Sequence, residues 1–274
     1  MGDLMEHDLF RLKERALKVR GHILRMAVRG GCFVGSALSC TDIVVFLYSA
    51  FLNITKDNLN DPGRDYLLLS KGHAVPVLYG TFAELGFLHP DRLKKHLETD
   101  DSVYWHPNRD IPGIEFHAGS LGHILAVASG VALDCKMRRQ DNRVAVIIGD
   151  GELNEGSVWE TLLIASAFRL DNLVIIIDRN RFQANAATED LIPLEPLISK
   201  LHAFGMSVRS INGHDFQDME DTFSGMPFEA GKPSVVIAHT IRGKGLLEIE
   251  NHADKWFCKY SDEEADRLIK ELTV

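Results

Sequence analysis

Four short apolar runs, each followed by polar or glycine residues, constrain the fold of this chain more than any other feature. The runs alternate with longer stretches in which apolar side chains recur at helical spacing. Strands that are apolar throughout and alternate with helices indicate a parallel sheet covered by helices on both faces. We therefore predict an α/β domain with strands at residues 66–69, 144–148, 173–177 and 235–238 and with helices that include residues 9–29, 41–51, 122–139 and 158–168.

The length and charge of the chain fit one domain of this kind. A sequence of 274 residues without an internal repeat can bury a large core, so residues 1–274 are treated as a single domain. The net charge of −9 argues against a protein that coats nucleic acid and against a basic helix that lies on a membrane surface. No apolar run is long enough to span a bilayer, and the acidic N-terminal segment does not resemble a secretory signal. We expect a cytoplasmic protein, with free thiols at Cys32, Cys40, Cys135 and Cys258.

Residues 144–180 carry the strongest functional signal. They read as a strand, then Gly149-Asp150-Gly151, then a helix, then a second strand that ends at Asn180. Because ligands bind beyond the carboxyl ends of parallel strands, Asp150 and Asn180 should face one cleft. Their oxygen atoms suit Mg²⁺ or Ca²⁺, and N–H groups at the start of the helix favour phosphate. The alternative is a plain turn at Asp150 and a helix cap at Asn180.

Several motifs in a fixed order give the sequence a family resemblance. It resembles the N-terminal, diphosphate-binding domain of transketolases through LLLSKGHAVPVLYG, HPNRDIPGIEFHAGSLGHILAVASGVAL, the GDG segment and IAHTIRGKGL. The likeness covers about residues 10–260, and the GDG segment with its later Asn is similar to the thiamine diphosphate signature. The resemblance implies the thiamine diphosphate-binding fold, with thiamine diphosphate and Mg²⁺ or Ca²⁺ as cofactors.

The resemblance also implies a residue for each contact with the metal and the diphosphate. The metal would be bound by the side chains of Asp150 and Asn180 and by the backbone carbonyl of Phe182. His73 in SKGH would contact the diphosphate and assist proton transfer, and Gly151 would add a backbone contact.

A second group of residues would surround the reacting part of the cofactor. By resemblance, Gly119 and Leu121 contact the aminopyrimidine ring through their main chain. His106 in WHP lies near the reacting carbon as a cofactor-binding and catalytic group. Glu155 in GELNEG is a cofactor-binding and catalytic carboxylate that links two active sites across a subunit interface.

Each of these side chains also has a purely structural interpretation. His73 and His106 could be surface or cap histidines, and Glu155 could be an N-terminal helix acid stabilised by the helix dipole. His117 and His123, which flank the GSLG turn, could line the pocket or merely pack.

Full-length transketolases continue into a pyrimidine-binding domain and a third domain, whereas this sequence ends at Val274. The resemblance therefore implies a second polypeptide, a C-terminal transketolase subunit, in an α2β2 heterotetramer with carbohydrate substrates. Alone, the chain is expected to be inactive.

Two positions depart from the family pattern. Phe33 stands where the loop after the first helix is expected to carry a histidine, and Phe257 replaces a second histidine after IRGKG, with His252 as a partial substitute. The change is either neutral drift or a more apolar substrate site, because two hydrogen-bonding side chains are replaced by aromatic rings.

Three functions are consistent with this pattern. The first is a transketolase-like transferase that moves a two-carbon unit from a keto donor, a specialised sugar, to an aldehyde or ketone. The alternative enzyme decarboxylates a 2-oxo acid such as pyruvate and transfers the acyl unit. The third is a scaffold subunit without activity, which the joint presence of Asp150, Asn180, Glu155, His73 and His106 disfavours.

Overall fold

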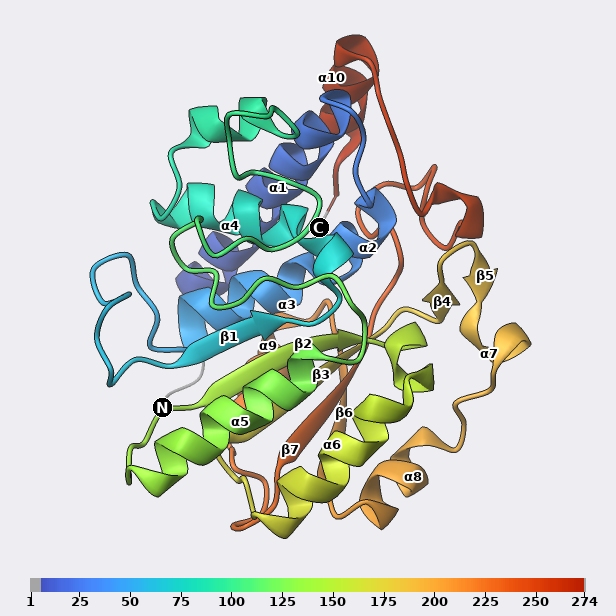
Figure 1. Cartoon of the computed structure of the whole chain (residues 1–274). Helices are drawn as coiled ribbons and strands as arrows, with labels where there is room; N and C mark the ends of the chain where they lie inside the picture. Colours follow the sequence, from blue (N-terminus) through green and yellow to red (C-terminus); the bar gives the residue numbers. More distant parts are fainter. Residues whose placement is uncertain (1–5, 274) are drawn as a thin grey trace.

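A five-stranded parallel sheet forms the centre of the molecule (Figure 1). The computed structural model describes residues 6–273. The strand order is β1-β2-β3-β7-β6, and every neighbouring pair is parallel. The strands are β1 (Tyr66–Leu69), β2 (Val144–Gly149), β3 (Leu173–Arg179), β6 (Ser207–Asn212) and β7 (Ser234–His239), and a separate antiparallel hairpin pairs β4 (Phe182–Gln183) with β5 (Ala186–Ala187).

Helices cover both faces of the sheet, as the apolar strands predict. Alternate side chains on each strand enter two separate cores; on β1, Leu67 enters one and Leu68 the other. The first core includes α1, α3, α4 and α9, and the second includes α5, α6 and α8 (Figure 1). The helices are α1 (Glu6–Val28), α2 (Val34–Ser39), α3 (Thr41–Phe46), α4 (Pro76–Leu85), α5 (Ile124–Met137), α6 (Gly156–Ala167), α7 (Thr188–Leu191), α8 (Leu197–Ala203), α9 (Phe216–Phe223) and α10 (Asp262–Glu271).

The sheet differs from the sequence prediction at one edge. All four predicted strands are present, but β6 is an additional strand, which lies at the edge and exposes the polar side chains of Arg209 and Ser210. The helical region also differs. The expected loop at residues 30–39 contains α2, and the helix expected at residues 41–51 is α3 followed by a short π-helix.

The four cysteines are free and buried, as the sequence predicts. Within residues 6–273, none of the helices has both the length and the apolar character needed to cross a bilayer.

A buried ion pair joins the helical layer to the loop after β7. Arg20 of α1 forms a bidentate pair with Asp42 of α3, at 2.9 and 2.7 Å, and both side chains are fully buried. His214 Nδ1 lies 2.7 Å from Asp42 Oδ2, and His214 Nε2 accepts a hydrogen bond from the Ile241 N–H. Arg20 Nε donates to the Lys244 carbonyl. The pair therefore fixes the segment that carries Arg242.

Replacement of Asp42 by Asn should lower the free energy of unfolding by about 3 to 5 kcal/mol, because Arg20 keeps its charge in a buried site. Burial opposes ionisation of Asp42, but Arg20 and His214 outweigh it and lower its pKa to about 2. The stabilisation is present above the unfolded pKa of about 3.9 and disappears as the pH falls through about 2. Urea unfolding from pH 7 to 2 measures both effects.

Asp134→Asn is the matched control for this prediction, because Asp134 forms an exposed pair with Arg138 on α5. Its free energy of unfolding should change by less than about 1 kcal/mol. Equal destabilisation by the two variants would contradict the role assigned to Asp42.

Candidate active site

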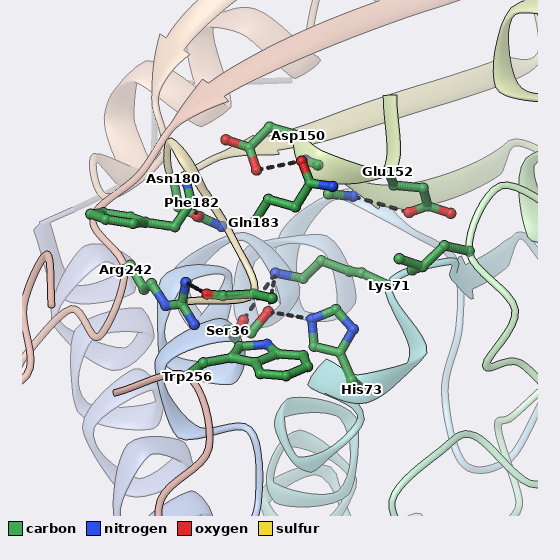
Figure 2. Close-up of a pocket in the computed structure, with 14 residues that line it drawn as sticks. Ser36, Lys71, His73, Asp150, Glu152, Asn180, Phe182, Gln183, Arg242 and Trp256 are labelled. Atoms are coloured by element: carbon green, nitrogen blue, oxygen red, sulfur yellow. Dashed lines mark hydrogen bonds between the residues drawn. The ribbon is translucent and has the colours of Figure 1, made fainter. Parts of the chain in front are cut away.

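A cavity of about 230 Å³ lies at the carboxyl edge of the sheet, where strand-end residues of β1, β2, β3 and β7 meet (Figure 2). Parallel strands present their carboxyl ends at one edge, and short loops there carry the polar residues. The residues that line the cavity are Ser36, Lys71, His73, Leu121, Gly149, Asp150, Gly151, Glu152, Asn180, Phe182, Gln183, Ala184, Arg242 and Trp256.

Asp150 is a buried carboxylate directly after β2. Its Oδ1 accepts a hydrogen bond from the Gly151 N–H at 2.9 Å, and its Oδ2 accepts from Arg179 Nη1 at 3.0 Å and from the Arg181 N–H at 2.6 Å. Burial, together with the nearby charge of Asp178, still raises the pKa of Asp150 to about 6. A cation at this carboxylate would offset the cost of its burial.

Asn180 and Phe182 approach the same cavity from the end of β3. Pairing of Gly149 with Asp178 in the β2–β3 register brings the two strand ends side by side. Asn180 is buried; its Oδ1 accepts from the Phe182 N–H at 3.0 Å, and its Nδ2 donates to Asp178 Oδ2 at 3.0 Å. Asp150 and Asn180 therefore both line one cavity. Each also accepts a local backbone hydrogen bond of the kind that the turn-and-cap alternative predicts, so their role as metal ligands stays a prediction.

Asp178 is a site residue that the sequence analysis missed. Its carboxylate accepts hydrogen bonds from four side chains, those of Ser39, Lys71, Asn180 and Thr240. Although burial opposes its charge, the adjacent ammonium group of Lys71 and these hydrogen bonds keep the pKa of Asp178 below its ordinary value. Asp178 thus joins the ends of β1, β3 and β7 to α2.

Glu152, also missed, has a similar role on the other side of Asp150. It accepts hydrogen bonds from the Ser70 hydroxyl, from the Gly122 N–H at 2.7 Å and from the Gly149 N–H at 3.1 Å. Burial raises its pKa. The Glu152 carboxylate therefore holds the SKGH, GSLG and GDG segments together.

His73 and His106 come from separate motifs, yet the charge of His106 is near enough to contribute to the lowered pKa of His73. His73 lines the cavity, and its Nε2 lies 2.8 Å from Ser36 Oγ. Burial first, then the positive charges of Lys71, His106 and Arg242, lower the pKa of His73 to about 3. Burial also lowers the pKa of His106. Both imidazoles are therefore neutral at physiological pH.

The predicted contacts from the GSLG turn are only partly placed at the cavity. Leu121 lines it, and Gly119 lies against His106, because a Cβ on Gly119 would come 3.2 Å from the His106 ring. Glu155 is exposed at the start of α6 and does not line the cavity. His117 and His123 are also exposed and are not among the residues that line this cavity.

Arg242 lines the cavity and has two buried donors without a hydrogen-bond partner among residues 6–273. Its Nη1 donates to the Ala184 carbonyl at 2.6 Å, whereas Nε and Nη2 are these two donors. Burial lowers the pKa of Arg242 to about 10, so the guanidinium remains charged at neutral pH. Buried, unpaired N–H groups are costly unless a ligand accepts their hydrogen bonds. The positive charge of Arg242 at the cavity would favour an anionic ligand there.

These features fit a metal-bound diphosphate. Asp150 supplies a carboxylate that a cation would stabilise, and Arg242 supplies a positive charge that favours phosphate oxygens. Within the described residues, no three His, Cys, Asp or Glu side chains form a metal cluster. The metal ligands that the sequence implies are instead the Asp150 carboxylate, the Asn180 amide oxygen and the Phe182 carbonyl. Phosphate oxygens would complete the coordination of a hard cation.

The missed residues had partial sequence signals. Lys71 follows the first apolar run, and Arg242 lies in the IRGKG motif, so both stand near strand ends where ligands bind. Asp178 closes an apolar run and is indistinguishable in the sequence from an ordinary polar residue of the following loop. Its four partners come from distant segments, which a single sequence does not place together.

Comparison with known proteins agrees with the fold. Residues 23–273 match the family described as transketolase, thiamine diphosphate binding domain. The sequence is 36% identical to one subunit of the apulose-4-phosphate transketolase of Actinobacillus succinogenes, over 98% of this chain and 97% of that protein. It is 35% identical to a 6-deoxy-6-sulfo-D-fructose transketolase subunit of a Clostridium species, over 87% of each chain.

A solved transketolase from Campylobacter jejuni has a similar fold, with a TM-score of 0.87 and 28% sequence identity. The match covers 95% of this chain but 42% of that one, so the chain spans about two fifths of the solved enzyme. The fold and the site define an α/β protein of the thiamine diphosphate-binding class. The chain belongs to the transketolase family, and it corresponds to the family's thiamine diphosphate-binding domain.

Replacement of Glu152 by Gln should loosen this site, because an amide cannot accept from all three donors that the carboxylate pairs with. An unpaired buried N–H costs about 1 to 3 kcal/mol, so the free energy of unfolding should fall by that amount. Glu160→Gln, on the exposed face of α6, is the control and should change it by less than about 0.5 kcal/mol. Chemical unfolding compares them, and equal stability of the two variants would refute the positioning role.

Proposed function

We propose that this chain binds thiamine diphosphate through a divalent metal ion and acts as the cofactor-holding subunit of a transketolase-type transferase. One observation carries the proposal: Asp150 and Asn180 line a single cavity that Arg242 also lines. The family membership agrees with it.

Each side chain at the cavity would have a defined task. Asp150, Asn180 and the Phe182 carbonyl would hold Mg²⁺ or Ca²⁺. His73, the Gly151 backbone and Arg242 would contact the diphosphate, and Gly119 and Leu121 would face the aminopyrimidine ring. When bound, thiamine diphosphate supplies the electron sink for carbon–carbon bond cleavage. The protein's contribution is placement, exclusion of water and proton handling.

The lowered pKa values of His73 and His106 keep both imidazoles neutral at neutral pH. A neutral imidazole has one ring nitrogen that can accept a hydrogen bond, so both rings suit orientation of a substrate hydroxyl more than they suit strong base catalysis. Glu155, exposed beside the GSLG turn, is placed where a second polypeptide could contact it. Its role as an interface carboxylate stays a prediction.

The assembly and the substrate class follow from the relatives. Two of them are named as transketolase subunits, for apulose-4-phosphate and for 6-deoxy-6-sulfo-D-fructose. We infer that this chain likewise needs a C-terminal transketolase subunit, in an α2β2 arrangement, and transfers a two-carbon unit from a specialised ketose to a carbonyl acceptor. No observation favours decarboxylation of a 2-oxo acid. The cytoplasmic location also stays a prediction.

Replacement of Asp150 by Ala should abolish metal-dependent cofactor binding. Loss of a residue that only orients a metal ligand typically weakens metal affinity about 10- to 100-fold, so loss of a direct ligand should cost about 100-fold or more. Titration of the reconstituted two-subunit protein with thiamine diphosphate, with and without Mg²⁺, measures the effect. Asp134→Asn is the control. Unchanged Mg²⁺-dependent affinity in the Asp150 variant would refute the proposed metal site.

Replacement of Arg242 by Met should weaken binding of thiamine diphosphate about 10- to 100-fold, because a hydrogen bond to a charged group contributes about 1.5 to 3 kcal/mol. Affinity for unphosphorylated thiamine should change much less. Arg267→Met removes an exposed arginine that pairs with Glu248 and Glu271 and should change neither affinity. An equal loss for both ligands would show that Arg242 does not bind the diphosphate.

A further inference from the structure

The hydroxyl group of Ser36 joins helix α2 to the segment after β1. Ser36 Oγ lies 2.8 Å from His73 Nε2 and 3.4 Å from Lys71 Nζ. All three residues line the cavity, and Figure 2 shows the hydroxyl next to the ammonium group and the imidazole ring. In the same view, the His73 ring points from its backbone towards the other side chains of the cavity. Ser36 is therefore a direct neighbour of the histidine in the proposed diphosphate site.

The fold holds both partners of this contact independently of the hydroxyl group. The Ser36 carbonyl accepts hydrogen bonds from Lys71 Nζ at 2.9 Å and from Ser39 Oγ at 3.0 Å. The Phe33 ring meets the His73 imidazole edge-on, with 5.4 Å between the ring centroids. Removal of the Ser36 hydroxyl alone should therefore leave the backbone of α2 and the His73 ring in place.

The number of donors and acceptors decides which atom carries the proton between Ser36 and His73. A lysine ammonium group can only donate, so Ser36 Oγ accepts from Lys71. Within residues 6–273, the remaining partner of Ser36 Oγ is His73 Nε2. If Nε2 carried a proton, the hydroxyl proton of Ser36, whose side chain is buried, would have no acceptor, which is costly. The pattern is satisfied when the Ser36 hydroxyl donates to an unprotonated Nε2.

This direction of the hydrogen bond determines what His73 offers to a ligand. Burial and the charge of Lys71 lower the pKa of His73, so the ring carries one proton at neutral pH. With Nε2 unprotonated, that proton is on Nδ1, which forms no hydrogen bond to any part of the chain that the structure describes. A diphosphate oxygen only accepts hydrogen bonds, so a contact between it and His73 requires an N–H group.

Resting on the proposed function, we propose that Ser36 is a positioning residue that fixes His73 as its Nδ1–H tautomer, the form that donates to an oxygen of the diphosphate. Lys71 orients the Ser36 hydroxyl, and the hydroxyl occupies the acceptor nitrogen of the ring. Of the two roles predicted for His73, this arrangement favours contact with the diphosphate over proton transfer. Ser36 acts through His73 and does not itself contact the cofactor.

NMR of the reconstituted two-subunit protein, with ¹⁵N-histidine only in this chain, tests the tautomer. Magic-angle-spinning spectra distinguish protonated from unprotonated ring nitrogens, and comparison with His73→Gln identifies the His73 signals. Without cofactor at neutral pH, we expect Nδ1 to be protonated and Nε2 unprotonated. Ser36→Ala should let the proton exchange between the two nitrogens, so that their chemical shifts approach each other. Ser36→Thr keeps the hydroxyl group and should restore the parent pattern.

Cofactor affinity measures the consequence for binding. With Mg²⁺, Ser36→Ala should weaken binding of thiamine diphosphate to the two-subunit protein about two- to tenfold, the range expected for one neutral hydrogen bond. Affinity for unphosphorylated thiamine should stay within about twofold of the parent value, because thiamine lacks the diphosphate. Ser129→Ala is the matched control: Ser129 is also buried on a helix, and its hydroxyl donates to the Leu125 carbonyl away from the cavity. It should change neither affinity.

Three results would overturn this inference alone: a parent His73 protonated on Nε2, an unchanged tautomer in Ser36→Ala, or an equal loss of affinity for both ligands in that variant. Absence of Mg²⁺-dependent cofactor binding in the parent protein would instead reject the proposed function. The tautomer, which is measured without cofactor, would still decide the role of Ser36. If Ser36→Ala does not fold, the parent spectrum decides the question.

Discussion

The buried ion pair between Lys71 and Asp178 supports the rest of the site. Both side chains are almost completely buried, and two charges in such a place are stable only when they are paired and fully hydrogen-bonded. Asp178 meets this condition with donors from α2, from the segment after β1, and from the ends of β3 and β7. Since these four segments also surround the cavity, its shape depends on this one carboxylate.

The buried carboxylates at this edge differ in how fully they are compensated. Lys71 and three further donors offset the burial of Asp178, and its pKa stays low. Asp150 has donors too, yet burial and the repulsion of Asp178 raise its pKa to about 6. The charge of Asp178 is therefore balanced by side chains of the protein itself. The charge of Asp150 is balanced less completely, so a bound cation would stabilise Asp150 more. This contrast, more than the GDG motif alone, supports Asp150 as the proposed ligand and Asp178 as its support.

The parts of the structure that were predictable from sequence are those that local pattern determines. Apolar runs identified β1, β2, β3 and β7, because the side chains of these strands are buried on both faces of the sheet, even in β1 at one edge. Strand β6, at the opposite edge, escaped notice because it carries exposed polar side chains such as Arg209. Asp150 and Asn180 were found because one strand-helix-strand unit brings them together. Asp178 and Arg242 were missed because their importance comes from partners that only the tertiary fold supplies.

The relation between Phe33 and Phe257, the two departures from the family pattern, is also visible only in the tertiary fold. In the sequence, Phe33 and Phe257 are separate substitutions, and either alone could be drift. In the fold, the Cys32–Cys258 bridge brings their rings to 5.2 Å, and Phe33 contacts His73. Phe33 also packs on Trp256, so both departures lie in one aromatic cluster beside the candidate site. They therefore alter the same part of the molecule, although they are far apart in the sequence.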